Sequence, residues 1–108
     1  MPGRAFLYVG DVFKPLQLSL DEFLEAWEGD KMALFELVRG EVERELGEVR
    51  GVRLLGAFLE PSSMTAVVEY LVELARGGEA SVKLVHAEDP GRALMEYYRA
   101  EREGRLAR

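Results

Sequence analysis

The chain has 108 residues, of which 48% are hydrophobic and 31% charged, and it contains no cysteine. This length predicts a single domain over residues 1–108, with enough apolar side chains for a core that needs no disulfide bond or structural metal. The formal net charge of −6 argues against nucleic-acid and anionic-membrane binding, because both need clustered cations.

The absence of cysteine excludes thiolate nucleophiles and cysteine-ligated zinc or iron–sulfur centres, and we expect no cofactor. The N-terminal apolar run is too short for a signal peptide, and no apolar stretch is long enough to span a bilayer. We therefore expect a cytoplasmic protein. Eleven arginines against three lysines suggest heat adaptation through surface ion pairs.

Aromatic and aliphatic residues over Arg4–Val9 predict the first strand. The segment Asp11–Leu18 is expected to be a loop, because Pro15 disfavours a helix just before it. Ser19 and Glu22 have the spacing of a capping box, in which each side chain bonds to the backbone of the other residue. A helix is therefore predicted to begin directly after Ser19.

Asp30 can cap a second helix that ends near Gly47, and the apolar run Val52–Leu59 predicts the second strand. The segment Met64–Arg76 admits two interpretations. Its polar residues fall in one narrow helical stripe, which favours a helix buried on most of its surface. The alternative is a strand over Met64–Val72 that pairs as a hairpin with the second strand.

Ala80–His86 is predicted to be the third strand, and Asp89 followed by Pro90 is a strong signal for the start of a last helix. Beyond about residue 100 the pattern fades into a charged tail that we expect to fray. The order β-αα-β-α-β-α predicts an α/β fold with a small three-stranded, mainly parallel sheet and flanking helices. The alternative fold is an α+β ferredoxin-like sandwich with Met64–Val72 as a strand.

Acidic or imidazole side chains follow each predicted strand: Asp11, then Glu60, then His86 with Glu88 and Asp89. In a parallel sheet these groups would gather at the edge where open α/β folds bind ligands. His86, the only histidine, is the candidate general base, with Asp11, Glu60 or Asp89 to orient it. Its ordinary role would be a hydrogen bond to a neighbouring loop.

The four carboxylates of this group are also the oxygen ligands that Mg²⁺ prefers, although Asp89 has a competing role as a helix cap and no metal is assigned. Ser62 and Ser63 precede the predicted buried helix, where their hydroxyls and free amides could bind a phosphate or carboxylate. They are also the candidate hydroxyl nucleophiles, with His86 as the base. No glycine-rich nucleotide-binding motif occurs in the sequence.

Residues 20–48 carry ten acidic against three basic side chains, whereas the C-terminal segment is rich in arginine. That segment could meet phosphates or the acidic region of a second subunit, or simply be solvated. The arginines recur at every third position: Arg99, Arg102, Arg105 and Arg108.

Apolar helices and open sheet edges predict self-association into a dimer or higher oligomer. We therefore expect an oligomeric binding or regulatory module without catalysis. The alternative is a small enzyme or ligand-binding protein, whose site would combine Asp11, Glu60, Ser62, His86 and Asp89.

Overall fold

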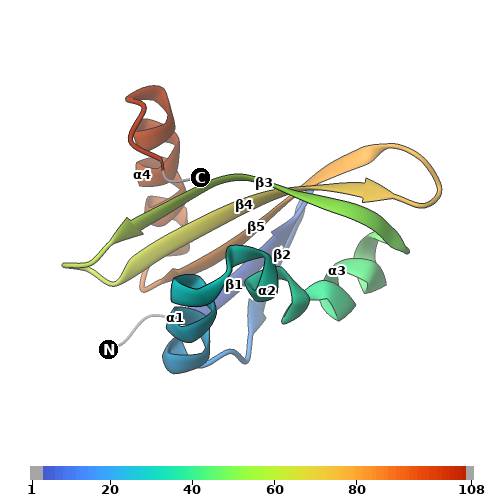
Figure 1. The fold of residues 1–108 in the computed structure, drawn as a ribbon. Coiled ribbons are helices and arrows are strands. Elements are labelled where there is room, and N and C mark those ends of the chain that lie inside the picture. The colour runs from blue at the N-terminus through green and yellow to red at the C-terminus, as the bar shows by residue number, and fades with distance from the viewer. Residues whose placement is uncertain (1–3, 107–108) are drawn as a thin grey trace.

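The computed structural model describes residues 4–106 (Figure 1). Its strands are β1 (Arg4–Val9), β2 (Val12–Leu16), β3 (Val49–Glu60), β4 (Thr65–Leu74) and β5 (Glu79–Ala87). Its helices are α1 (Leu20–Gly29), α2 (Lys31–Glu36), α3 (Arg39–Leu46) and α4 (Pro90–Arg102). The strands form one five-stranded sheet in the order β2-β1-β5-β4-β3, and every neighbouring pair is antiparallel.

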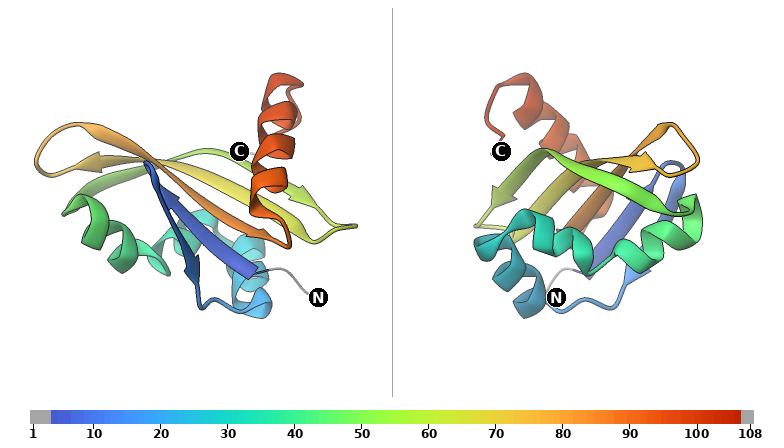
Figure 2. Two further views of the ribbon diagram at one scale, coloured as in Figure 1. Left: turned by 180° about the vertical axis from the view of Figure 1, so that it is seen from behind. Right: turned by 45° about the vertical axis from the view of Figure 1, so that its right-hand side comes forward.

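Helices cover both faces of this sheet (Figure 2). The inner face lies under α1, α2 and α3, where the larger apolar core contains Leu7, Phe23, Leu34, Val68 and Leu84. The outer face lies under α4, which packs mainly on β3, β4 and β5. The smaller core there contains Phe58, Val67, Val85, Ala93 and Tyr97. Within residues 4–106, no helix is long and apolar enough to cross a membrane.

The predicted three-stranded, mainly parallel sheet is wrong. The segment Met64–Arg76 forms β4 and not a helix, and the expected loop Asp11–Leu18 contains β2. The hairpin of the alternative interpretation is present, because β3 pairs with β4 in an antiparallel register. The ferredoxin-like plan is also wrong, since that plan has four strands and the order β-α-β-β-α-β.

The position of β4 explains why its pattern resembled that of a helix. It lies between β3 and β5, and apolar side chains cover both of its faces. Glu69 and Glu73 are four residues apart, a spacing that places two side chains on one face of a strand as well as of a helix. A periodicity of four therefore does not distinguish the two structures.

Local signals act as predicted at the helix starts. Both bonds of the capping box between Ser19 and Glu22 are present at α1, and Asp30 and Asp89 accept amide hydrogen bonds at the starts of α2 and α4. The helix expected from Asp30 to Gly47 is interrupted, since α2 ends at Glu36 and α3 begins at Arg39.

A tight turn joins β1 to β2. Val9 pairs with Val12, so the turn consists of Gly10 and Asp11, and Gly10 has a φ of +58°. Positive φ at the first position alone is the pattern of a type II′ turn, which matches the twist of two antiparallel strands.

Candidate functional site

The antiparallel sheet separates residues that a parallel sheet would have brought together. In the register of β1 and β5, Val9 lies opposite Val82 and Ala5 lies opposite His86. Asp11 follows Val9, so Asp11 and His86 lie at opposite ends of the sheet. They therefore do not share a site.

His86 lies within the inner core. It is 1% exposed, and its ring centroid is 5.4 Å from that of Phe23. Burial lowers the pKa of the imidazole, an effect that a hydrogen bond with the Met64 backbone partly opposes, and Nδ1 has no partner among the described residues. The His86 side chain lies on the inner face, whereas Glu60, Ser62, Ser63 and Asp89 line hollows beside α4 on the outer face.

Glu60, Ser62, Ser63, Glu88 and Asp89 do come to the same end of the sheet, between the β3–β4 turn and the start of α4. Glu60 accepts hydrogen bonds from the amide and the hydroxyl of Ser62, at 3.2 and 2.7 Å, which lower the pKa of its carboxyl group. Ser63 donates to the Thr65 hydroxyl at 2.9 Å. The two serines thus lead into a strand, and the anion-binding helix start predicted at this point is absent.

A groove runs between this turn and α4, and we call it the α4 groove. It consists of two adjoining hollows of about 410 and 370 Å³, which share Ser63, Arg92 and Glu96 in their walls. Arg99 and Arg105 complete the second hollow. The sequence placed Arg99 and Arg105 in a charged tail and did not single out Arg92 or Glu96.

A helical-spacing signal could have found part of this groove. Arg92, Glu96 and Arg99 lie four and three residues apart, so they share one side of α4. The Arg92–Glu96 pair has an N–O distance of 3.4 Å. Arg102 of the predicted stripe is exposed and lines neither hollow, whereas Arg108 lies outside the described residues.

An aromatic cluster lies on the other flank of α4, where the outer face of β1 and β2 is largely uncovered. The ring of Phe13 stacks on Phe6 at 5.2 Å and lies 4.9 Å from the ring of Tyr8. Phe13 is 48% exposed. Leu94 of α4 packs against the same outer cluster as Phe6 and Tyr8, and the ring of Tyr98 lies beside Lys83, which pairs with Tyr8. We call the five side chains of Phe6, Tyr8, Phe13, Leu94 and Tyr98 the aromatic patch. The sequence missed it because Phe13 was assigned to a loop.

A polar network holds α4 to the sheet between the groove and the patch. Glu69 accepts hydrogen bonds from the Tyr97 hydroxyl at 2.8 Å and from the Ser81 hydroxyl at 2.9 Å. The ammonium group of Lys83 lies 3.7 Å from the same carboxylate. Burial, followed by the bond to Glu69, raises the pKa of Tyr97. The groups of this network satisfy one another and line neither hollow of the groove, which indicates a structural role.

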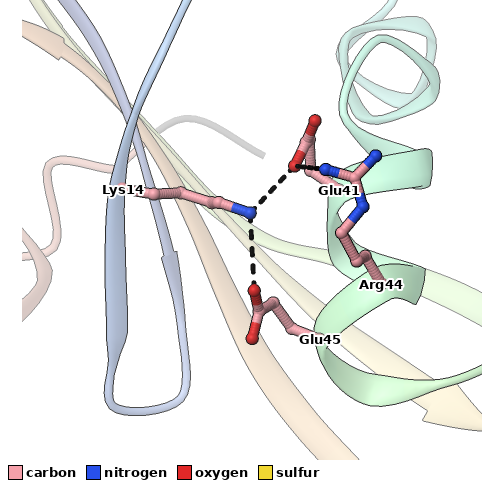
Figure 3. Close-up of polar contacts among 4 residues, drawn as sticks. All are labelled: Lys14, Glu41, Arg44 and Glu45. Carbon is pink, nitrogen blue, oxygen red and sulfur yellow. Dashed lines mark hydrogen bonds and ion pairs between the residues drawn. The ribbon is translucent and has the colours of Figure 1, made fainter.

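The acidic residues 20–48 form mainly the three helices α1, α2 and α3 on the inner face of the sheet. Part of its charge is neutralised by Lys14 of β2, whose ammonium group lies 2.8 Å from Glu41 and 3.4 Å from Glu45 (Figure 3). Arg44 contacts the same Glu41 oxygen at 3.1 Å. These ion pairs tie the edge strand β2 to α3.

The described part of the chain contains no cluster of three acidic or histidine side chains that could hold a metal ion. Comparisons with protein-family models, curated proteins and solved structures found no significant match to this chain. The function proposed below therefore rests on the residues of this chain and on their geometry.

Proposed function

We propose that this protein is a cytoplasmic, homo-oligomeric binding module without catalysis, and that its copies associate through the aromatic patch. The observation that carries this proposal is the exposure of Phe13 within a stacked cluster. Scattered apolar side chains are normal on a protein surface, but clustered exposed aromatic rings are typical of interfaces.

The aromatic patch is a different basis for self-association from the apolar helices that the sequence suggested. The apolar segment predicted as a helix is β4, and its side chains are buried inside the monomer. Apolar surface for an interface must therefore come from elsewhere, and Phe13 and Tyr98, which are 48% and 37% exposed, provide it.

The charges around the patch support a second copy as its partner. Arg4 alternates with Phe6 and Tyr8 along β1, so it shares their face of the sheet, whereas Asp11 lies at the other end of the β1–β2 hairpin. In a two-fold dimer the same patch meets itself. A two-fold axis through its centre would place Arg4 of each copy near Asp11 of the other.

Contact through the patch fits better than extension of the sheet at β2. Val9 and Val12 close the two-residue turn and form a hydrogen-bonded pair, and such pairs alternate with non-hydrogen-bonded pairs along the two strands. Phe13 and Pro15 belong to the non-hydrogen-bonded pairs, so their backbone groups face the open edge of β2. Proline has no N–H group to offer a neighbouring strand. Pro15 therefore weakens this edge as a pairing site.

Light scattering on size-separated protein across a concentration series tests the proposal. The wild type is expected to form a dimer, and Phe13→Ser is expected to shift the equilibrium towards the monomer. Leu37→Ser is the matched control, because Leu37 is similarly exposed, at 50% compared with 48% for Phe13, and lies beyond α2. A wild type that stays monomeric at all concentrations would contradict the proposal.

A charge exchange tests the two-fold arrangement. Arg4→Glu and Asp11→Arg should each weaken the dimer, because each places like charges opposite one another. The double variant should restore it. Failure of the double variant to recover would mean that the two residues do not meet across the interface.

Ligand binding is a second candidate, favoured by the α4 groove, which brings Glu60, Ser62 and Asp89 together. The enzyme alternative needed these three residues in one pocket with Asp11 and His86. The structure separates those two from the groove, so a site in the groove would have to work without the histidine.

A further inference from the structure

The two ends of the α4 groove differ in charge. Its two hollows adjoin through shared walls at Ser63, Arg92 and Glu96, so one elongated ligand could occupy both. The paired charges of Arg92 and Glu96 lie at the middle of this groove. The ligand class is therefore set by the residues found in only one of the two hollows.

The second hollow is the cationic end. Arg99 and Arg105 line it, and the carboxylate that belongs to this hollow alone is Glu60. Glu60 already accepts two hydrogen bonds from Ser62, and Arg105 forms an ion pair with Glu103 at 2.6 Å. Arg99 makes no ion pair with any residue between 4 and 106. Its guanidinium group can bind a carboxylate through two parallel hydrogen bonds.

The first hollow is the anionic end. Glu88 and Asp89 line it, and no cation belongs to this hollow alone. Asp89 accepts the amide hydrogen bond that caps α4, at 3.1 Å. Glu88 is exposed and makes no side-chain hydrogen bond or ion pair with the described residues. An ammonium group is the natural partner for a carboxylate in this position.

The length of the groove selects among ligands that carry both charges. Asp89, the residue that caps α4, and Arg99 are ten residues apart, which corresponds to about 15 Å along the helix axis at about 1.5 Å per residue. A single amino acid is too short to reach both ends. An extended chain of four residues spans roughly 13–14 Å. This span fits the groove if the side chains at its two ends lean towards the ligand.

We propose that the α4 groove binds a short peptide of about four residues with free termini. Its carboxylate lies against Arg99 and Arg105, and its ammonium group lies against Glu88. The hydroxyl groups of Ser62 and Ser63 donate to Glu60 and Thr65, so their oxygen atoms can accept from N–H groups of the peptide backbone. None of the residues of the aromatic patch lines the groove, so the two sites can be tested separately.

Isothermal titration calorimetry with three forms of tetra-alanine tests the proposal. The free peptide carries both charges, N-acetyl-tetra-alanine lacks the ammonium group, and tetra-alanine amide lacks the carboxylate. The free peptide should bind at least about tenfold more tightly than either capped form, which corresponds to about one charge-assisted contact. Equal binding of all three forms, or no binding of the free peptide at millimolar concentration, would overturn the proposal.

Two variants locate the ends of the peptide. Arg99→Gln should reduce the difference between the free peptide and its amide, because only Arg105 is then left to meet the carboxylate, and Glu88→Gln should abolish the difference between the free and the acetylated peptide. Arg102→Gln and Glu25→Gln are the matched controls, because both residues are exposed and lie outside the groove. An equal loss of binding in a variant and its control would mean that net charge, and not the groove, attracts the peptide.

The same titration with Phe13→Ser separates this inference from the proposed self-association. Peptide affinity should stay unchanged in that variant while the dimer is lost. A dimer without peptide binding would overturn the groove proposal alone, and peptide binding by a strict monomer would overturn the self-association proposal alone.

Discussion

The hydroxyl group of Tyr97 occupies the space that a side chain at Gly56 would need. A Cβ atom at Gly56 would lie 2.9 Å from the Tyr97 hydroxyl oxygen and 2.8 Å from a methyl carbon of Leu106. From this position Tyr97 donates its hydrogen bond to Glu69. The glycine in β3 therefore determines how closely α4 approaches the sheet.

Gly56→Ala should destabilise the protein. The Leu106 methyl group can move away, but the Tyr97 ring is fully buried and held by Glu69, so the helix or the strand must shift. Overpacking of this kind costs about 1–3 kcal/mol in the free energy of unfolding. Urea denaturation of the variant and the wild type measures the difference.

Gly40→Ala is the matched control for this substitution. Gly40 lies in α3 and lacks a positive φ, and a Cβ atom added there would meet no atom within 4 Å. Alanine at this position should leave stability unchanged or raise it by up to about 1 kcal/mol. If both variants were equally stable, the close contact between Gly56 and Tyr97 would not limit the packing of α4.

Acid should destabilise the protein through His86. Its pKa in the native state is lowered by burial, so the native state favours the neutral ring, whereas the unfolded chain takes up a proton near the ordinary value of 6.5. Stability is therefore fully present above that value and falls as the pH drops below it, by at most about 1.4 kcal/mol per pH unit. Urea denaturation between about pH 7.5 and about pH 5.5 covers this range.

His86→Leu isolates the contribution of the imidazole, because the chain has one histidine. The pKa values of Glu36, Glu41 and Glu60 are lowered from 4.5, by a hydrogen bond from Arg39, Lys14 and Ser62 respectively, so these groups titrate below the range tested. The variant should lose little stability between the two pH values. A loss as large as that of the wild type would show that another group is responsible.

The elements that the sequence predicts correctly are those with short-range signals. The first strand has its predicted bounds, Arg4–Val9, and Ser19 and Asp89 cap helices as expected. Each of these signals involves residues at most a few positions apart, so a single segment contains all the information. Whether two strands pair in a parallel or an antiparallel direction cannot be found from a single segment, because pairing depends on segments far apart in the chain.

The strand β2 and the α4 groove were missed for the same reason, which is that both depend on how distant segments of the chain lie against one another. Proline at position 15 argues against a strand only where its N–H would be needed, and on the outward side of an edge strand it is not. Arg92 and Arg99 share one side of a predicted helix, but Ser62 and Ser63 line the same hollow only because β3 and β4 form a hairpin beneath α4. Sequence patterns alone could not supply that contact.

Lys14→Met should destabilise the protein slightly, and only at low ionic strength. The substitution keeps the aliphatic part of the side chain and removes the contacts with Glu41 and Glu45. Salt screens partly exposed ion pairs, so the difference from the wild type should disappear at high salt. Urea denaturation at low and high salt measures it, and Arg76→Met, at an exposed position, is the control.

The same variant should change the titration of Glu41. A hydrogen bond from Lys14 lowers the pKa of this carboxyl group, so it stabilises the native state above its ordinary value of 4.5 and loses that effect as the pH falls. In Lys14→Met the pKa should rise towards 4.5, as measured by nuclear magnetic resonance. A loss of stability that persists at high salt, with no change in this pKa, would point to lost packing instead of lost charge.

Pro15→Val should create a second mode of association, through the edge of β2. Valine restores an N–H group on the outward side of an edge strand and favours extended backbone, so β2 could pair with a strand of another copy. Sedimentation velocity should detect larger species than in the wild type. Because this contact does not use the patch, the double variant with Phe13→Ser should still form them. If Pro15→Val left the size distribution unchanged, a feature of the edge other than the proline would be what prevents strand pairing.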